Sequence, residues 1–98
     1  MNLPLTLRRM AQAEFDEAVD WYEGQNPALG TAFARAVNEV FERIRSMPRS
    51  NPVVEGDLRE ALVSGFPFAV YYRVGQGKIT VSAVFHTSRD PEEWRRRV

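Results

Sequence analysis

The chain has no cysteine and a single histidine among its 98 residues. Without thiolates, and with one imidazole, we expect neither a disulfide framework nor a metal site, and the missing cysteine fits a reducing compartment. The short glycine motif at 75–77 joins two strand-like runs and does not open a helix, so it lacks the context of a nucleotide-binding loop. We therefore expect no cofactor.

Long apolar runs are also absent. No stretch approaches the roughly 20 residues of a membrane-spanning helix. The first ten residues space their apolar side chains and do not form the continuous core of a signal peptide. We expect a cytoplasmic protein with no membrane contact. The length predicts one domain over residues 1–98, and 44% apolar residues are enough for one modest core.

Charge of either sign is not in excess, because 13 basic residues balance 13 acidic ones. A neutral total argues against holding a nucleic acid by broad electrostatics alone. The distribution is uneven: residues 10–24 carry five acids and no base, and all bases except Lys78 are arginine. Arginine favours planar, bidentate pairing. This pattern suits a protein partner at least as well as RNA.

The clearest strand pattern is residues 66–86, where two alternating runs flank a loop at 75–78. A four-residue loop pairs Val74 with Ile79, and the register then continues through three apolar pairs. These pairs are Tyr72 with Val81, Val70 with Ala83, and Phe68 with Phe85. The same alternation predicts an open, polar face on the other side of the hairpin. Its members are Tyr71, Arg73, Ser82 and His86.

The remaining chain predicts a strand at 2–8, helices at 10–24 and 27–47, a loop at 48–57, a strand at 58–63 and a short C-terminal helix that begins after Asp90. Trp94 is expected to anchor that last helix. The fold class is therefore α+β: a small twisted antiparallel sheet, in the order β-α-α-β-β-β, with an αα-hairpin on one face. We expect four strands, with the first strand beside the last.

Two registers remain open for the strand at 58–63. A three-residue turn places Leu62 opposite Phe68 and Arg59 opposite Tyr71, but it turns Glu60 toward the core. A two-residue turn places Ala61 opposite Phe68 and turns Arg59 inward. The first register is preferred because Leu58 and Leu62 both gain apolar partners.

Several segments, taken in order, resemble the RelE/ParE toxins of type II toxin–antitoxin systems. They are AEFDEAVDWYE followed by NPALGTAF, the helix-ending MP, the strand GFPFAVYYRV, and the closing VFHTSRDPEEWRRR. The long helical hairpin and the HTSRDP ending resemble the ParE side and the broader plasmid stabilisation proteins. The family fold is a twisted antiparallel sheet under a helical hairpin, which agrees with the pattern above.

The resemblance implies a growth-inhibiting toxin that needs no cofactor and forms a hetero-oligomer with a ParD-like or RelB-like antitoxin. ParE-like members inhibit DNA gyrase by protein–protein contact, which is the favoured function. RelE-like members are ribosome-dependent mRNA endoribonucleases, which is the first alternative. The second alternative is a chain without toxicity that serves as the antitoxin's partner and co-repressor.

A nuclease would need cations around the phosphorane and a group that transfers a proton. Arg59, Arg73 and His86 are the candidate catalytic residues, but the lysine cluster of RelE-like enzymes is missing. His86 lies four residues, or about 13 Å, along its strand from Ser82. We therefore do not expect it to contact the Arg59–Tyr71 pair, and this separation weakens the nuclease hypothesis. Residues expected to contact a target or partner are Arg59, Tyr71, Arg73, His86, Arg89, Arg95, Arg96 and Trp21. Structural roles compete for several of them, such as an acid partner for Arg59 and strand-end packing for His86.

Overall fold

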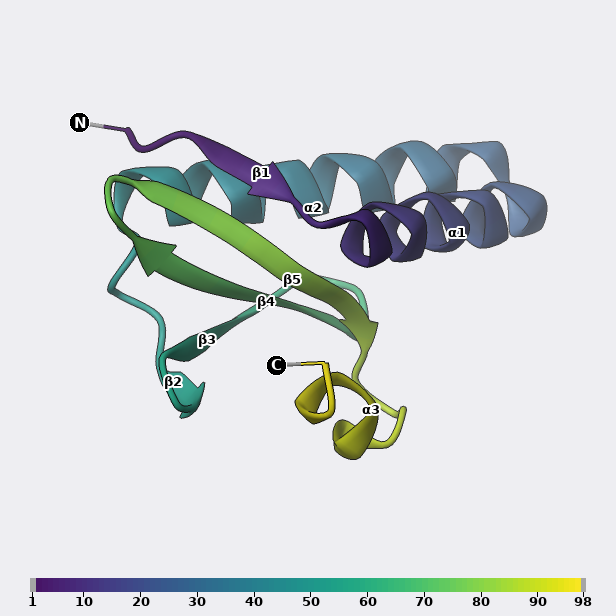
Figure 1. The fold of residues 1–98 in the computed structure, drawn as a ribbon. Coiled ribbons are helices and arrows are strands. Elements are labelled where there is room, and N and C mark those ends of the chain that lie inside the picture. Colours follow the sequence, from purple (N-terminus) through teal and green to yellow (C-terminus); the bar gives the residue numbers. More distant parts are fainter. Residues whose placement is uncertain (1, 98) are drawn as a thin grey trace.

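A computed structural model describes residues 2–97 as a five-stranded sheet with helices on both sides (Figure 1). The strands are β1 (Leu5–Leu7), β2 (Val53–Glu55), β3 (Leu58–Leu62), β4 (Phe68–Gly75) and β5 (Lys78–His86), in the spatial order β1-β5-β4-β3-β2. The helices are α1 (Arg9–Gln25), α2 (Pro27–Ser46) and α3 (Pro91–Arg95). The predicted α+β architecture is confirmed. The strand β2 is an addition, because its residues were expected to lie in a loop.

Helices α1 and α2 form the predicted hairpin, with bounds close to those expected. Asn26 separates them and caps α2, since its Oδ1 accepts a hydrogen bond from the Ala28 N–H at 2.9 Å. Pro27 occupies the first turn of α2, where its missing N–H costs nothing. Gly30 is required where the two helices meet, because a Cβ there would lie 2.9 Å from the Cβ of Glu23. The helical spacing of apolar residues in 27–47 predicts a buried stripe that includes Leu29 and Met47, but both side chains are exposed.

The main core lies between this hairpin and one face of the sheet. Fully buried side chains of α2 meet the central strands there, and each contributes about 1.5–3 kcal/mol by leaving water. The largest fully buried side chains of this core, from α2 and from strands β4 and β5, are Phe33, Val37, Val40, Ile44, Val70, Tyr72, Ile79, Val81 and Val84. Phe15, Val19 and Tyr22 of α1 are partly buried against this cluster. The helical spacing of these three residues in the sequence predicts one apolar stripe, and the structure turns that stripe toward the core.

The β4–β5 hairpin follows the predicted register only near its loop. Val74 pairs with Ile79 and Tyr72 with Val81, as expected. Beyond that point Ser82 is an extra residue, so Tyr71 pairs with Ala83 and Phe68 pairs with His86. The predicted Val70–Ala83 and Phe68–Phe85 pairs are wrong, because this β-bulge reverses the faces of the strand after it.

The bulge creates a second, smaller core on the side of the sheet opposite the helical hairpin. Helix α3 lies on this side of the sheet (Figure 1). Its Trp94, which is only 5% exposed, covers the second core. The cluster consists of Leu58, Ala69, Tyr71, Ala83, Phe85 and Trp94. The open polar face expected here is wrong, since Tyr71 and Ser82 are each 6% exposed. The expected anchoring role of Trp94 is confirmed.

Strand β3 follows neither of the two expected registers. Arg59 pairs with Tyr72, Glu60 with Tyr71, and Ala61 with Val70. This register places Ala61 in the main core and turns Glu60 away from it. Arg59 lies on the core side, as in the second expected register, because it pairs with Tyr72. At the other edge, β1 pairs in parallel with β5, and Leu5 lies opposite Ile79. The predicted neighbour of the first strand is therefore confirmed. No helix within residues 2–97 is long and apolar enough to cross a membrane.

Candidate functional site

Arg59 is bound to the loop that precedes β2. Its Nη1 donates to the carbonyl oxygens of Asn51 at 2.6 Å and Arg49 at 3.2 Å. The hydroxyl of Tyr72, opposite Arg59 in the ladder, donates to the carbonyl oxygen of Pro48 in the same loop at 2.7 Å. The structure gives the Arg59 guanidinium the role of a loop anchor. The acid partner considered for it, Glu60, points to the other face.

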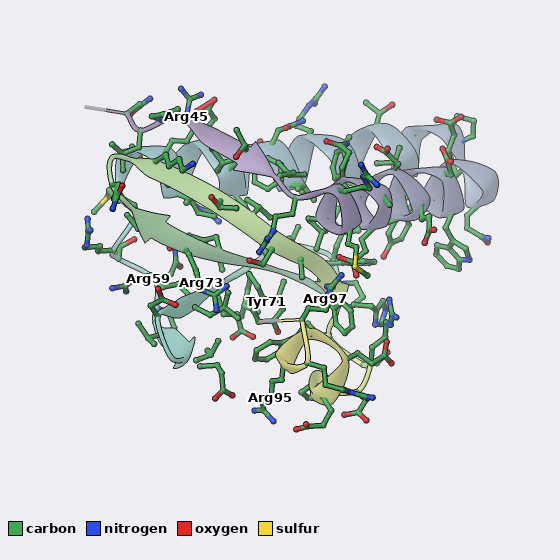
Figure 2. All side chains as sticks on the ribbon, in the orientation of Figure 1. Arg45, Arg59, Tyr71, Arg73, Arg95 and Arg97 are labelled. Carbon is green, nitrogen blue, oxygen red and sulfur yellow. The ribbon has the colours of Figure 1, made fainter. Side chains whose placement is uncertain are left out.

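Tyr71, expected on an open face, is buried beneath Trp94. It lies on the side of the sheet that α3 covers (Figure 2). Its hydroxyl donates a hydrogen bond of 2.7 Å to Glu60. Burial raises the pKa of the Tyr71 phenol well above its ordinary value, and the Glu60 carboxylate raises it further. A phenol in this state holds its proton firmly and is covered from any large substrate.

Arg73 lies on the same side of the sheet as Tyr71, where its Nε donates to Asp57 at 2.6 Å. This hydrogen bond lowers the pKa of the exposed Asp57 carboxyl. Arg59 follows the alternation of Tyr72 and lies on the opposite side. The sequence placed Arg59 and Arg73 on one face, and the structure separates them by the thickness of the sheet.

His86 ends β5 on the side of the helical hairpin, with its ring edge-on to Phe68 at 5.1 Å. Its Nδ1 accepts a hydrogen bond from the Ser88 N–H at 3.1 Å and lies 2.7 Å from the Ser88 Oγ. Phe68 and Tyr72 are the β4 partners of His86 and Arg59, four residues or about 13 Å apart along the strand. The imidazole and the Arg59 guanidinium therefore do not form one catalytic group.

His86 instead borders an apolar groove between α1 and the ends of β4 and β5. The groove has a volume of about 540 Å³. Trp21, which is 61% exposed, packs edge-on against Tyr22 in its wall, at 5.1 Å. The residues lining the groove are Ala18, Trp21, Tyr22, Pro67, Phe68, His86, Ser88 and Arg89. We call it the Trp21 groove. It brings together three of the residues expected to contact a partner.

Arg89, Arg95 and Arg96 lie in or beside α3, and each contacts an acidic residue of that helix through its side chain or its backbone carbonyl. Arg89 pairs with Glu93 at 2.6 Å and stacks over the Phe85 ring. Arg95 pairs with Glu92 at 3.1 Å and with Glu55 of β2 at 3.3 Å. The Nε of Arg96 donates to the backbone carbonyl of Glu92. These guanidiniums surround α3 at the surface and do not converge on His86.

A further pair, Glu14 and Arg97, was not singled out from the sequence. The Glu14 carboxylate accepts a hydrogen bond from the Val84 N–H at 3.1 Å, just past the bulge, and it binds Arg97 Nη2 at 3.1 Å. The pair joins α1 to the residues after α3. Glu14 is one of five acids in 10–24 and Arg97 one of three consecutive arginines, so composition alone gives no reason to select them.

Comparison with known proteins gives one family. A family model described as the ParE toxin of the type II toxin-antitoxin system parDE matches residues 5–91. A chain of the solved structure "Chromosomal ParDE TA system from P. aeruginosa" superposes with a TM-score of 0.77, at 18% sequence identity. The alignment covers 88% of this chain and 97% of that one, and at this identity it speaks for the fold. Among curated protein sequences, none matches.

Proposed function

The chain belongs to the ParE toxin family, and on this premise we propose that it inhibits DNA gyrase by protein–protein contact in the cytoplasm and is neutralised by an antitoxin. The proposal extends family membership to a target, a mode of action and a partner. Gyrase inhibition by contact would need a shaped surface and no reacting group of the toxin itself.

The placement of the candidate nuclease residues is the observation that carries this choice. Arg59 anchors a loop, Arg73 pairs with Asp57 across the sheet, and His86 packs against Phe68. An endoribonuclease must bring its cations and its proton-transfer group to one phosphate. Within residues 2–97 these three side chains lie on two faces and at separate points along β4. Their separation supports action by contact over RNA cleavage.

The Trp21 groove supports the antitoxin part of the proposal. Large exposed apolar side chains beside a concave surface are typical of protein–protein contact sites, and tryptophan and arginine dominate the binding energy of such sites. Arg89 lies at the margin of the groove. An amphipathic antitoxin segment would bury apolar residues against Trp21 and Phe68 and place an acid near Arg89.

A gyrase supercoiling reaction with the purified chain tests the proposed target, with both supercoiling and trapped double-strand cleavage recorded. We expect loss of supercoiling together with cleaved DNA. The double variant Arg59→Ala with His86→Ala should retain the effect if it remains folded, because neither residue acts as a catalyst in this proposal. Unaffected supercoiling at a large molar excess of folded chain would contradict the proposal and favour mRNA cleavage on the ribosome or a non-toxic chain.

A further inference from the structure

A second cavity, separate from the Trp21 groove, lies where the start of α1 meets the bulge of β5 and the residues after α3. Its volume is about 320 Å³. It is lined by Arg8, Arg9, Met10, Ser82 and Arg97. Ser82 is the extra residue of the bulge, so the departure from regular pairing is what brings a hydroxyl to this place. None of the nuclease or antitoxin arguments above uses this cavity.

Two residues that line the cavity each carry a buried polar atom without a partner in the part of the chain that the structure describes. These atoms are the Oγ of Ser82 and the Nη1 of Arg97. Ser82 is only 6% exposed. Leaving such groups unpaired costs on the order of 1–3 kcal/mol each, and more for a charged donor, so an unpaired group in a native fold calls for an explanation. Both atoms are hydrogen-bond donors, so a ligand that accepts hydrogen bonds would satisfy both.

The charge of the wall has the same sign throughout. Three arginines, Arg8, Arg9 and Arg97, line the cavity, and the recorded acid contact among them is Glu14 on the Nη2 of Arg97. The first turn of α1 contains no acidic side chain, and the N-cap residue Arg8 makes no capping hydrogen bond. Two positively charged arginines at the start of a helix are unfavourable, because the N-terminal end of the helix dipole is also positive and favours anions. The first N–H groups of a helix also lack intrahelical acceptors.

From these two independent features we infer that the cavity binds a phosphate-type oxyanion. A tetrahedral anion presents several acceptor oxygens at once, which suits the Ser82 hydroxyl, the Arg97 Nη1 and the start of α1 together. A cation would be repelled by three arginines, and an apolar ligand would leave both donors unpaired. The volume leaves room for the anion and several waters, each of which takes about 30 Å³.

The anion has two possible sources, because the cavity shares lining residues with a neighbouring groove of about 490 Å³. Arg8 and Ser82 line both spaces, and Arg73 and Lys78 line the groove together with Asp57, which is paired with Arg73. Free inorganic phosphate would occupy the cavity alone, whereas the phosphodiester chain of a nucleic acid would continue along the groove. The inference is independent of the proposed gyrase target.

Calorimetric titration with inorganic phosphate at constant ionic strength tests the site. We expect saturable binding to the full chain, and a weakening on the order of tenfold or more in the double variant Arg9→Gln with Ser82→Ala, which loses a charged donor and a hydroxyl. Arg35→Gln, an exposed arginine of α2, is the matched control and should bind as the unaltered chain does. A thermal melt of each protein verifies the fold, since neither Arg9 nor Ser82 makes a recorded side-chain hydrogen bond within residues 2–97.

A second titration with a short DNA duplex distinguishes the two sources. Phosphate binding without duplex binding would identify the free anion. Duplex binding that phosphate displaces and the double variant weakens would identify the phosphodiester. The inference is overturned if neither ligand binds, or if the double variant and the Arg35→Gln control bind both ligands equally, which would indicate an adventitious ion only.

Discussion

The indole ring of Trp94 stacks on the phenol ring of Tyr71, with centroids 4.4 Å apart and planes inclined by 23°. This contact joins a five-residue helix, too short to be stable alone, to the centre of the sheet. The contact belongs to the smaller of two apolar cores, which lie on opposite sides of β4.

Replacing Trp94 by alanine should lower the free energy of unfolding by about 3 kcal/mol or more, since it removes a large side chain that is almost fully buried. Urea denaturation followed by circular dichroism measures the change. Trp21→Ala is the matched control, because Trp21 is 61% exposed and its loss should change stability by about 0.5 kcal/mol or less. Equal effects of the two substitutions would contradict the second core.

Stability should fall as the pH rises above about 10, in part because of Tyr71. Burial and the Glu60 carboxylate raise the pKa of this phenol above the ordinary value of 10.0, so the unfolded chain releases the proton at a lower pH than the folded chain. Urea unfolding from about pH 9 to about pH 11 should show a shallower decline in Tyr71→Phe. Tyr22, whose pKa burial also raises, accounts for part of the remaining decline. An unchanged slope in Tyr71→Phe would refute this assignment.

Glu14→Ala should destabilise the fold by about 2 kcal/mol, because it leaves the Val84 N–H and the Arg97 guanidinium without their shared acceptor. The two side chains are 14% and 18% exposed, so water replaces the acceptor poorly. Glu42→Ala, which breaks an exposed pair with Arg45, is the control and should cost about 0.5 kcal/mol or less. Chemical denaturation of both variants gives the comparison.

Trp21→Ala should weaken binding of the proposed antitoxin by about 30-fold or more, the usual cost of removing an aromatic side chain at the centre of a protein interface. Calorimetry with the antitoxin product of the neighbouring reading frame measures the affinity. Met47→Ala removes a similarly exposed apolar side chain just after α2, at the opposite end of the helical hairpin from Trp21, and should bind normally. Similar affinities for both variants would move the antitoxin away from the Trp21 groove.

The helices could be predicted from the sequence because their signals are local. Asn26 and Pro27 mark the start of α2, and Pro48 follows its end. The β4–β5 register was predictable only as far as the loop geometry extends. Past Tyr72, residues 83–85 are all apolar, so alternation fits either face equally well, and only tertiary packing shows that Ser82 is an extra residue. A continuous apolar run is itself a sign of a strand buried on both sides.

The residues of the site were harder to predict, because an error of one residue in strand register assigns each side chain to the wrong face of the sheet. Arg59 and Tyr71 were paired across a ladder in which they are one position out of register, and so they were assigned to a shared face. His86 was placed on the wrong side by the same bulge. The inward Glu60 was the available warning, since a carboxylate in a small core needs a partner, and the true register supplies the Tyr71 hydroxyl.

The parallel pairing of β1 with β5 also bears on when this chain can fold during its synthesis. Leu5 finds its partner Ile79 only after nearly the whole chain has been made, and loop closure over such a separation is slow. The residues of the helical hairpin are made much earlier, and its contacts are close in sequence. Its apolar face stays exposed until the strands have been made and pack against it. A ribosome that stops before β5 therefore releases a chain without its first strand in place, and the surfaces described above exist only in the finished protein.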